Sequence, residues 1–238
     1  MLLLVSASDS IDAAAALDGG ADIVDAKDPR TGALGAVSLD VFRGIRAAVA
    51  NRRPLSAAIG DATDEAAIEG TAFEFAAAGA VFVKVGLGGV TSAGRAASLA
   101  RAAQRGVVAA GAGRCGLVVV AYADADEATG IAPAALVDVA ARSGARGVLL
   151  DTAGKNRPGL LALISADDLA AWVARAHARR LLAAVAGKLT ADDLSLVCET
   201  GADIVGVRGA ACEHGRSSAV SAAKVKALRL QLPQLTRQ

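Results

Sequence analysis

The sequence contains few of the residues that metal sites, disulfides and nucleic-acid binding require. Its 238 residues include three Cys, two His, one Trp and one Tyr. The three Cys are widely spaced and form no Cys-x-x-Cys pair, which argues against a disulfide framework or a structural zinc site and favours a reducing compartment. Since no cluster of His, Cys or carboxylates is evident, we expect no metal and no other cofactor.

An excess of charge of one sign is also missing. The chain has 25 Lys and Arg against 24 Asp and Glu, a formal net charge of +1, whereas proteins that bind nucleic acids usually carry a basic excess. The N-terminal apolar run, residues 1–5, is too short for a signal peptide, and no apolar run is long enough to span a membrane. We therefore expect a cytoplasmic protein that binds neither nucleic acid nor a membrane.

What the sequence has in quantity is small aliphatic residues. Hydrophobic residues make up 54% of the chain and charged residues 21%, so it can bury a sizeable core. Short apolar runs, beginning near residues 2, 22, 55, 81, 117, 147, 182 and 203, alternate with helical patterns near 9–18, 38–50, 64–78, 92–109, 133–143, 166–179, 190–200 and 217–230. This alternation is typical of parallel strands with helical crossovers. Eight such pairs predict an α/β single-domain (β/α)8 TIM barrel over residues 1–238.

A weak internal repeat supports the barrel. The segment Gly20-Ala-Asp-Ile-Val24 recurs at 201–205, and looser copies occupy 79–83 and 144–148. Each Gly follows a helical pattern, where a left-handed helix C-cap is expected, and precedes an even-numbered strand.

The repeat also predicts which side chains point into the barrel. Side chains alternate along a strand, so the third, fifth and seventh residues after each Gly share one face. The third are Ile23, Phe82, Gly147 and Ile204; the fifth are Asp25, Lys84, Leu149 and Gly206; the seventh are Lys27, Gly86, Asp151 and Arg208. Inward residues of alternate strands form layers, so charge gathers at the carboxyl ends of the strands, where barrel enzymes have their active sites.

The charged layers suggest amine chemistry by Lys27, Lys84 and Lys155 beside Asp25 and Asp151. Two lysines that share a water-poor pocket repel each other, which lowers the pKa of at least one of them. A neutral lysine attacks carbonyl carbons and forms a Schiff base, and a second lysine or a carboxylate can then move a proton on the adjacent carbon. The same residues also fit a structural Lys–Asp network that caps the barrel.

The loops after the seventh and eighth strands contain Gly187, Gly206, Arg208 and Gly209. These loops are the usual phosphate-binding position of a barrel, since small residues let backbone N–H groups approach the anion. Arg208 could add a bidentate contact. The alternative is a pair of ordinary glycine turns. Tyr122 is expected either to donate to a substrate oxygen or to lie partly buried with its hydroxyl in water.

Several segments resemble one known family. They are Asp22-Ile-Val-Asp-Ala-Lys-Asp-Pro-Arg-Thr-Gly-Ala-Leu-Gly35, Val83-Lys-Val-Gly-Leu87, Leu150-Asp-Thr-Ala153 with Lys155, and Asp203-Ile-Val-Gly-Val-Arg-Gly-Ala-Ala-Cys212. In this order they are similar to the (5-formylfuran-3-yl)methyl phosphate synthase family, and the resemblance covers nearly the whole chain.

The resemblance implies an aldolase-like lyase of methanofuran biosynthesis. Such enzymes condense two molecules of glyceraldehyde 3-phosphate and lose water and one phosphate to give a phosphorylated hydroxymethyl-furancarboxaldehyde. The family's Schiff-base lysine corresponds to Lys27 and its proton-moving lysine to Lys84. Asp25, Asp151 and Lys155 match its other active-site positions.

Two other functions remain open at this point. One is a generic Schiff-base phosphosugar aldolase or isomerase on the same barrel, and the other is a non-catalytic barrel used for binding or assembly.

The Ala-rich helices, which have few aromatic residues, can pack closely against another copy of the chain. We therefore expect a homo-oligomer.

Overall fold

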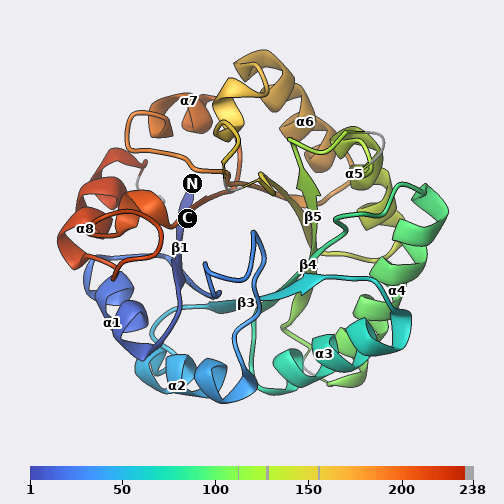
Figure 1. Cartoon of the computed structure of the whole chain (residues 1–238), viewed down its shortest axis with the longest axis horizontal. Coiled ribbons are helices and arrows are strands. Elements are labelled where there is room, and N and C mark those ends of the chain that lie inside the picture. Colours follow the sequence, from blue (N-terminus) through green and yellow to red (C-terminus); the bar gives the residue numbers. More distant parts are fainter. Residues whose placement is uncertain (112, 127–128, 155, 234–238) are drawn as a thin grey trace.

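The strands close into a barrel that is surrounded by helices (Figure 1). A computed structural model describes residues 1–111, 113–126, 129–154 and 156–233. The strands are β1 (Leu2–Ala7), β2 (Ile23–Ala26), β3 (Leu55–Asp61), β4 (Phe82–Gly86), β5 (Gly116–Tyr122), β6 (Gly147–Asp151), β7 (Leu182–Val185) and β8 (Ile204–Val207). The helices are α1 (Ser10–Asp18), α2 (Leu39–Val49), α3 (Glu65–Ala77), α4 (Ala93–Ala109), α5 (Pro133–Arg142), α6 (Ala166–Ala178), α7 (Leu194–Glu199) and α8 (Ala222–Gln231). The predicted (β/α)8 fold is confirmed.

All neighbouring strands pair in parallel, and β8 pairs with β1 to close the barrel. Each strand begins within one residue of its predicted start. Helices α7 and α8 begin later than predicted. Before α7, the Asp193 carboxylate accepts hydrogen bonds from the Thr190 amide and hydroxyl at 2.7 and 2.8 Å, so residues 190–193 form a turn. Before α8, residues 213–219 form a loop that contacts Arg208.

The internal repeat ends helices and links neighbouring strands at the amino-terminal end of the barrel. Its glycines have left-handed φ angles, as predicted for C-caps: +89° at Gly20, +101° at Gly79, +75° at Gly144 and +78° at Gly201. In the two closest copies, Asp22 accepts a hydrogen bond from the Leu3 amide at 2.9 Å and Asp203 accepts one from the Ala183 amide at 2.8 Å. The repeated Asp therefore ties each strand to its neighbour.

Two apolar clusters stabilise the fold. The larger one fills the space between the strands and the surrounding helices. The smaller one fills the barrel interior and includes Ile23, Leu149 and Ile204, with Phe82 packed against it. These residues lie on the face that the repeat predicted to point inward, so the register of the even-numbered strands is confirmed.

Short polar side chains fix where many of the helices start. The Asp9 carboxylate accepts hydrogen bonds from two amides at the start of α1, and Ser38, Asp64, Ser92 and Ser165 each accept one at the start of α2, α3, α4 and α6. Such caps satisfy N–H groups that have no partner within the helix. No helix in the described part of the chain is long and apolar enough to cross a membrane.

Helices α3 and α4 pack unusually closely at Gly106. A Cβ atom added to Gly106 would overlap the backbone carbonyl oxygen of Glu69 in α3. We expect Gly106→Ala to lower the free energy of unfolding by about 1–3 kcal/mol, the usual range for overpacking. Chemical denaturation measures this change.

Gly70 in α3 is the matched control, because a Cβ atom there meets nothing within 4 Å. Gly70→Ala should stabilise the protein by roughly 0.5–1 kcal/mol, since Ala has the higher helix propensity. Equal effects of the two substitutions would contradict the close contact between α3 and α4.

Candidate active site

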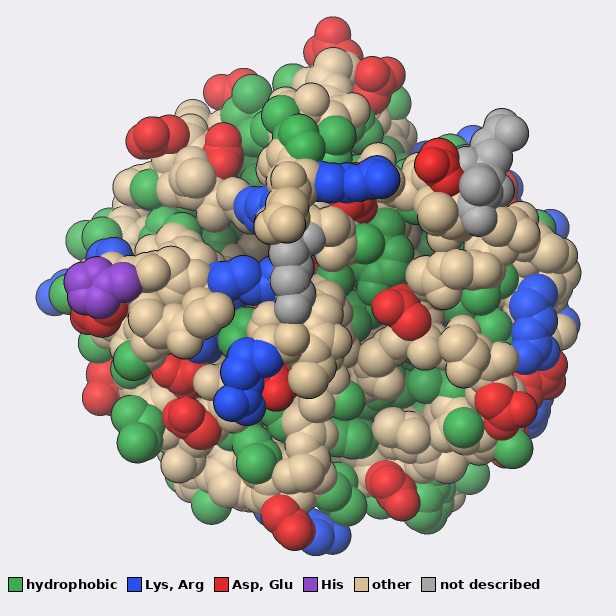
Figure 2. Space-filling view, viewed as in Figure 1, with side chains coloured by type: hydrophobic (Ala, Val, Ile, Leu, Met, Phe, Trp, Pro, Cys, Tyr) green, Lys and Arg blue, Asp and Glu red, His purple; other side chains and the backbone are tan. Residues whose placement is uncertain are grey.

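A cavity of about 500 Å³ opens at the carboxyl ends of the strands. Among the predicted site residues it is lined by Lys27, Lys84, Asp151, Gly187, Gly206, Arg208 and Gly209. Figure 2 shows Lys and Arg side chains near the centre of this face of the molecule. The volume of the cavity lies within the range of about 300–1,000 Å³ that is common for small-molecule sites. The structure therefore brings the predicted amines and the predicted phosphate loops to one place.

Asp25 is the centre of a buried hydrogen-bond network on the cavity floor. Its carboxylate is fully buried and accepts hydrogen bonds from the Lys84 amine at 2.6 Å, from Ser56 at 2.6 Å and from Ser6 at 3.1 Å. These partners come from β4, β3 and β1, the strands around β2. A buried ion pair loses hydration on folding, and the two hydroxyl groups offset part of that loss.

Lys27 follows β2 directly and pairs loosely with Asp151, at 3.8 Å between Nζ and Oδ2. Burial lowers the pKa of the Lys27 amine; the charge of Asp151 opposes this change, and the charge of Lys84 adds to it. The lowered pKa agrees in direction with the expectation for two lysines in one pocket. Asp151 is held in place by the Thr152 amide, which donates to its carboxylate at 2.7 Å.

The guanidinium of Arg208 lines the cavity but makes most of its hydrogen bonds within the protein. It donates to the carbonyl oxygens of Ser6, Arg216 and Ser218 at 2.8–2.9 Å and to Asp12 at 2.7 Å. Four of its five N–H groups are therefore used. Arg208 fixes the loop before α8 against β1 and α1. The one N–H group that remains allows a single hydrogen bond to a phosphate, not the bidentate contact that we expected.

Gly187 is needed in the loop after β7 for two reasons. Its φ angle is +113°, and a Cβ atom would lie 3.0 Å from both Leu160 Cβ and Thr152 Cγ2. A larger residue would therefore strain the loop and fill the space beside the cavity. The absence of a side chain lets the backbone line the cavity, as the phosphate prediction for Gly187, Gly206 and Gly209 requires.

Two further predicted residues have different outcomes. Tyr122 is buried and its hydroxyl donates to Asp61 at 2.9 Å, so neither predicted environment describes it fully. Burial, and next the charge of Asp61, raises the pKa of Tyr122. Lys155 lies outside the described residues.

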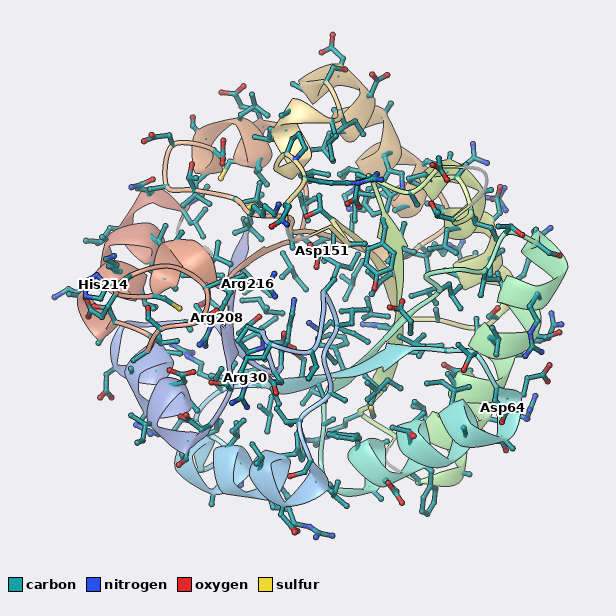
Figure 3. The ribbon with its side chains drawn as sticks, viewed as in Figure 1. Arg30, Asp64, Asp151, Arg208, His214 and Arg216 are labelled. Atoms are coloured by element: carbon teal, nitrogen blue, oxygen red, sulfur yellow. The ribbon has the colours of Figure 1, made fainter. Side chains whose placement is uncertain are left out.

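Sequence reasoning missed three polar residues of the site. Ser6 and Ser56, which bond Asp25, follow or interrupt apolar strand runs, and the alternation of inward side chains could have identified them. Arg216 also lines the cavity. It lies in a loop without periodicity, and Figure 3 places it with Arg208 and Asp151 toward the barrel centre, whereas His214 lies at the rim.

The described residues provide no obvious ligand set for a metal ion. Within 1–111, 113–126, 129–154 and 156–233, no group of three or more His, Cys, Asp or Glu side chains could hold one. Lys188 also lines the cavity, but its amine donates to the carbonyl oxygen of Arg157. The chemistry assigned to the cavity is that of Lys27 and Lys84, the two amines that lie beside a carboxylate.

The chain is similar to known synthases over most of its length. Residues 3–229 match the family model described as 4-HFC-P synthase. The chain is 37% identical over 216 residues to the (5-formylfuran-3-yl)methyl phosphate synthase of Methanococcus maripaludis, covering 90% of this chain and 91% of that one. It is 41% identical over 221 residues to a Streptomyces griseus protein whose assignment to the same activity is provisional, with 90% and 87% covered.

Solved structures of low sequence identity share the fold. The 3-hexulose-6-phosphate synthase of Salmonella typhimurium superposes with a TM-score of 0.65 at 21% identity, covering 97% of this chain and 99% of that one. At this identity the similarity supports the barrel fold alone.

The ion pair of Lys27 with Asp151 gives a prediction about pH. Asp151→Asn removes a charge that raises the pKa of Lys27, so that pKa should fall further below the usual lysine value of about 10.4. Acetylation of Lys27 by acetic anhydride, followed by mass spectrometry across pH, should show its midpoint at lower pH in the variant. The exposed Lys226 serves as the internal reference. An unchanged or higher midpoint would show that Asp151 does not stabilise the charged amine.

Proposed function

The chain belongs to the 4-HFC-P synthase family, and on this basis we propose that it makes (5-formylfuran-3-yl)methyl phosphate from two molecules of glyceraldehyde 3-phosphate. The atoms balance when one inorganic phosphate and two molecules of water are released. The proposed reaction is a step of methanofuran biosynthesis and makes the protein a lyase that works through a lysine Schiff base.

The observation that carries the proposal is the pairing of two amines with two carboxylates around one cavity. Lys27 lies 3.8 Å from Asp151, and Lys84 lies 2.6 Å from Asp25. Burial favours the neutral form of Lys27, which is the form that attacks a carbonyl carbon. The site therefore provides a nucleophile and, separately, a group that can exchange protons.

In the proposed mechanism the Lys27 amine attacks the aldehyde carbon of one triose phosphate, and water leaves to give an iminium ion. The positive nitrogen acidifies the C–H bond at C2. Lys84 gives its proton to the hydroxyl group that leaves as water, so its amine is then neutral and takes the C2 proton. The electron pair of the C–H bond forms an enamine. Asp25 stabilises the resulting ammonium ion through the 2.6 Å contact.

The enamine also explains how phosphate can leave. The phosphate is attached to C3, next to the enamine carbon C2. The enamine electrons form a C2–C3 double bond, the iminium ion is restored, and the phosphate departs with the electron pair of the C3–O bond. The second triose, as its enediol tautomer, adds through its C2 to the electrophilic C3. The C2 oxygen of the first triose then closes the ring on the aldehyde carbon of the second, and loss of the two waters gives the furan. Hydrolysis of the iminium ion releases the formyl group and returns the Lys27 amine.

Other predicted residues have supporting roles in this proposal. Asp151 holds Lys27 or a substrate hydroxyl group. The retained phosphate binds at the loops that contain Gly187, Gly206, Arg208 and Gly209, all of which line the cavity. Lys155 stays a predicted active-site residue.

Trapping with borohydride tests the nucleophile. Purified protein mixed with glyceraldehyde 3-phosphate and sodium borohydride should carry a stable adduct on Lys27, and without reductant it should release a furan chromophore. Lys27→Arg should abolish both, since an arginine side chain stays protonated; Lys226→Arg is the matched control on an exposed face. An adduct found only on Lys155 would assign the Schiff-base role to Lys155 and not to Lys27. An adduct on Lys27 without furan formation would favour a generic aldolase or isomerase.

Removal of the buried pair tests the proton-moving role of Lys84. The double variant Asp25→Asn with Lys84→Met avoids the roughly 3–5 kcal/mol that an unpaired buried charge costs. It should still form the Lys27 adduct but make furan at least about 100-fold more slowly, the usual effect of losing a general acid–base group. Mass spectrometry and absorbance separate the two steps, and furan formation at the full rate would exclude this role.

A further inference from the structure

Arg216 is a cation of the cavity that the proposed mechanism does not use. Its backbone lies beside Gly209, after β8, and its side chain reaches the loop after β2. There its Nη2 group donates to the carbonyl oxygens of Pro29 at 3.0 Å and Gly32 at 3.2 Å. Arg216 lines the same cavity as Lys27, and Figure 3 shows it on the inner side of the loop that precedes α8.

The guanidinium of Arg216 has an unsatisfied donor. Its Nε atom is buried and has no hydrogen-bond partner among the described residues. Removing a charged donor from water without giving it an acceptor is costly, and an exception of this kind in a native structure calls for an explanation. Because Nε is buried, a ligand in the cavity would reach the guanidinium through Nη1, for which no hydrogen bond within the described residues is found either.

Arg216 also differs from the neighbouring cations in its charge environment. Lys27, Lys84 and Arg208 lie within 4.0 Å of the carboxylates of Asp151, Asp25 and Asp12. In the part of the chain that the structure describes, Arg216 and Lys188 line the cavity without such an ion pair, and the Lys188 amine instead donates to the Arg157 carbonyl oxygen. The positive charge of Arg216 contributes to the lowered pKa of Lys27 and so favours the neutral amine. The cavity therefore has positive charge beside Lys27 that no described carboxylate neutralises.

The missing partner is best explained as an anion with several acceptor oxygens. A guanidinium binds phosphate through parallel N–H donors and is weakly hydrated, so it suits a partly buried phosphate site. Two triose phosphates together have about as many non-hydrogen atoms as a small drug molecule, for which a cavity of about 300–1,000 Å³ is usual. The proposed reaction brings two phosphates into the cavity. One is assigned to Gly187, Gly206, Arg208 and Gly209. Arg216 lies farther along the loop after β8, and its side chain extends away to the loop after β2.

We propose that Arg216 binds the second phosphate, the one that leaves from the triose attached to Lys27. This inference rests on the proposed function. In the elimination step, the C3–O bond breaks and its electron pair goes to the phosphate oxygen, while the C2–C3 double bond forms. The Nη1–H groups and the positive charge of Arg216 stabilise the negative charge that develops on the departing phosphate. Arg208 is the positioning residue, because it donates to the Arg216 carbonyl oxygen.

The number of phosphate esters bound per chain tests the second site without any reaction. Glycerol 3-phosphate has no carbonyl group and cannot form an imine, so isothermal titration reports binding alone. The unmodified protein should bind two molecules per chain, and Arg216→Gln should bind one. His214→Ala, an exposed change on the same loop, should leave two. One molecule per chain in the unmodified protein, or two in Arg216→Gln, would overturn the proposal.

Arg216→Lys keeps the test decisive if Arg216→Gln does not fold. A lysine retains the charge and a donor for the carbonyl oxygens of Pro29 and Gly32, but it lacks the additional Nη1–H groups. It should weaken binding at the second site by about tenfold or more, as expected when a charge-assisted hydrogen bond is lost. Unchanged affinity at both sites would overturn the proposal.

A kinetic experiment separates failure of this inference from failure of the proposed function. With glyceraldehyde 3-phosphate, Arg216→Lys should still form the adduct on Lys27 that borohydride traps. Without borohydride, it should release phosphate at least about tenfold more slowly than the unmodified protein. Furan formation with unchanged phosphate release in the variant rejects the role of Arg216 alone. The opposite result is also informative. If the unmodified protein forms no furan but binds two glycerol 3-phosphate molecules, and Arg216→Gln binds one, the proposed reaction is wrong and the second phosphate site is supported.

Discussion

The fully buried carboxylate of Asp25 determines the arrangement of the site. It accepts hydrogen bonds from Ser6, Ser56 and Lys84, so three strands around β2 present a polar group to one point inside the barrel. An unpaired charge at this depth would be strongly destabilising. The requirement for partners fixes Lys84 on the cavity floor, and its positive charge then acts on the second amine, Lys27.

The fold and the inward-facing layers could be predicted because both follow from local periodicity. A glycine with left-handed φ ends a helix before each even-numbered strand, and side-chain alternation then decides which residues face the interior. This reasoning placed Asp25 and Lys84 on one face, and the 2.6 Å contact between their side chains agrees. The family resemblance contributed the roles of Lys27 and Lys84, which periodicity alone does not distinguish.

The parts that the sequence did not predict depend on contacts between distant segments. The start of α8 is displaced because residues 213–219 fold back onto Arg208. The bonds of Arg208 to Asp12 and to loop carbonyl oxygens follow from the path of that loop, which has no repeating pattern. Arg216 was missed for the same reason, since only the folded chain brings it to Pro29 and Gly32.

The most direct test of the central claim is a measurement of the protonation of Lys27 in the unmodified protein. The claim is that burial and a second amine keep Lys27 ready to react as a neutral nucleophile. Nitrogen-15 NMR of the lysine side chains, with Lys27 assigned by substitution, follows this group as the pH changes. The account predicts a Lys27 pKa below the usual value of about 10.4. A Lys27 pKa at or above that value would contradict it.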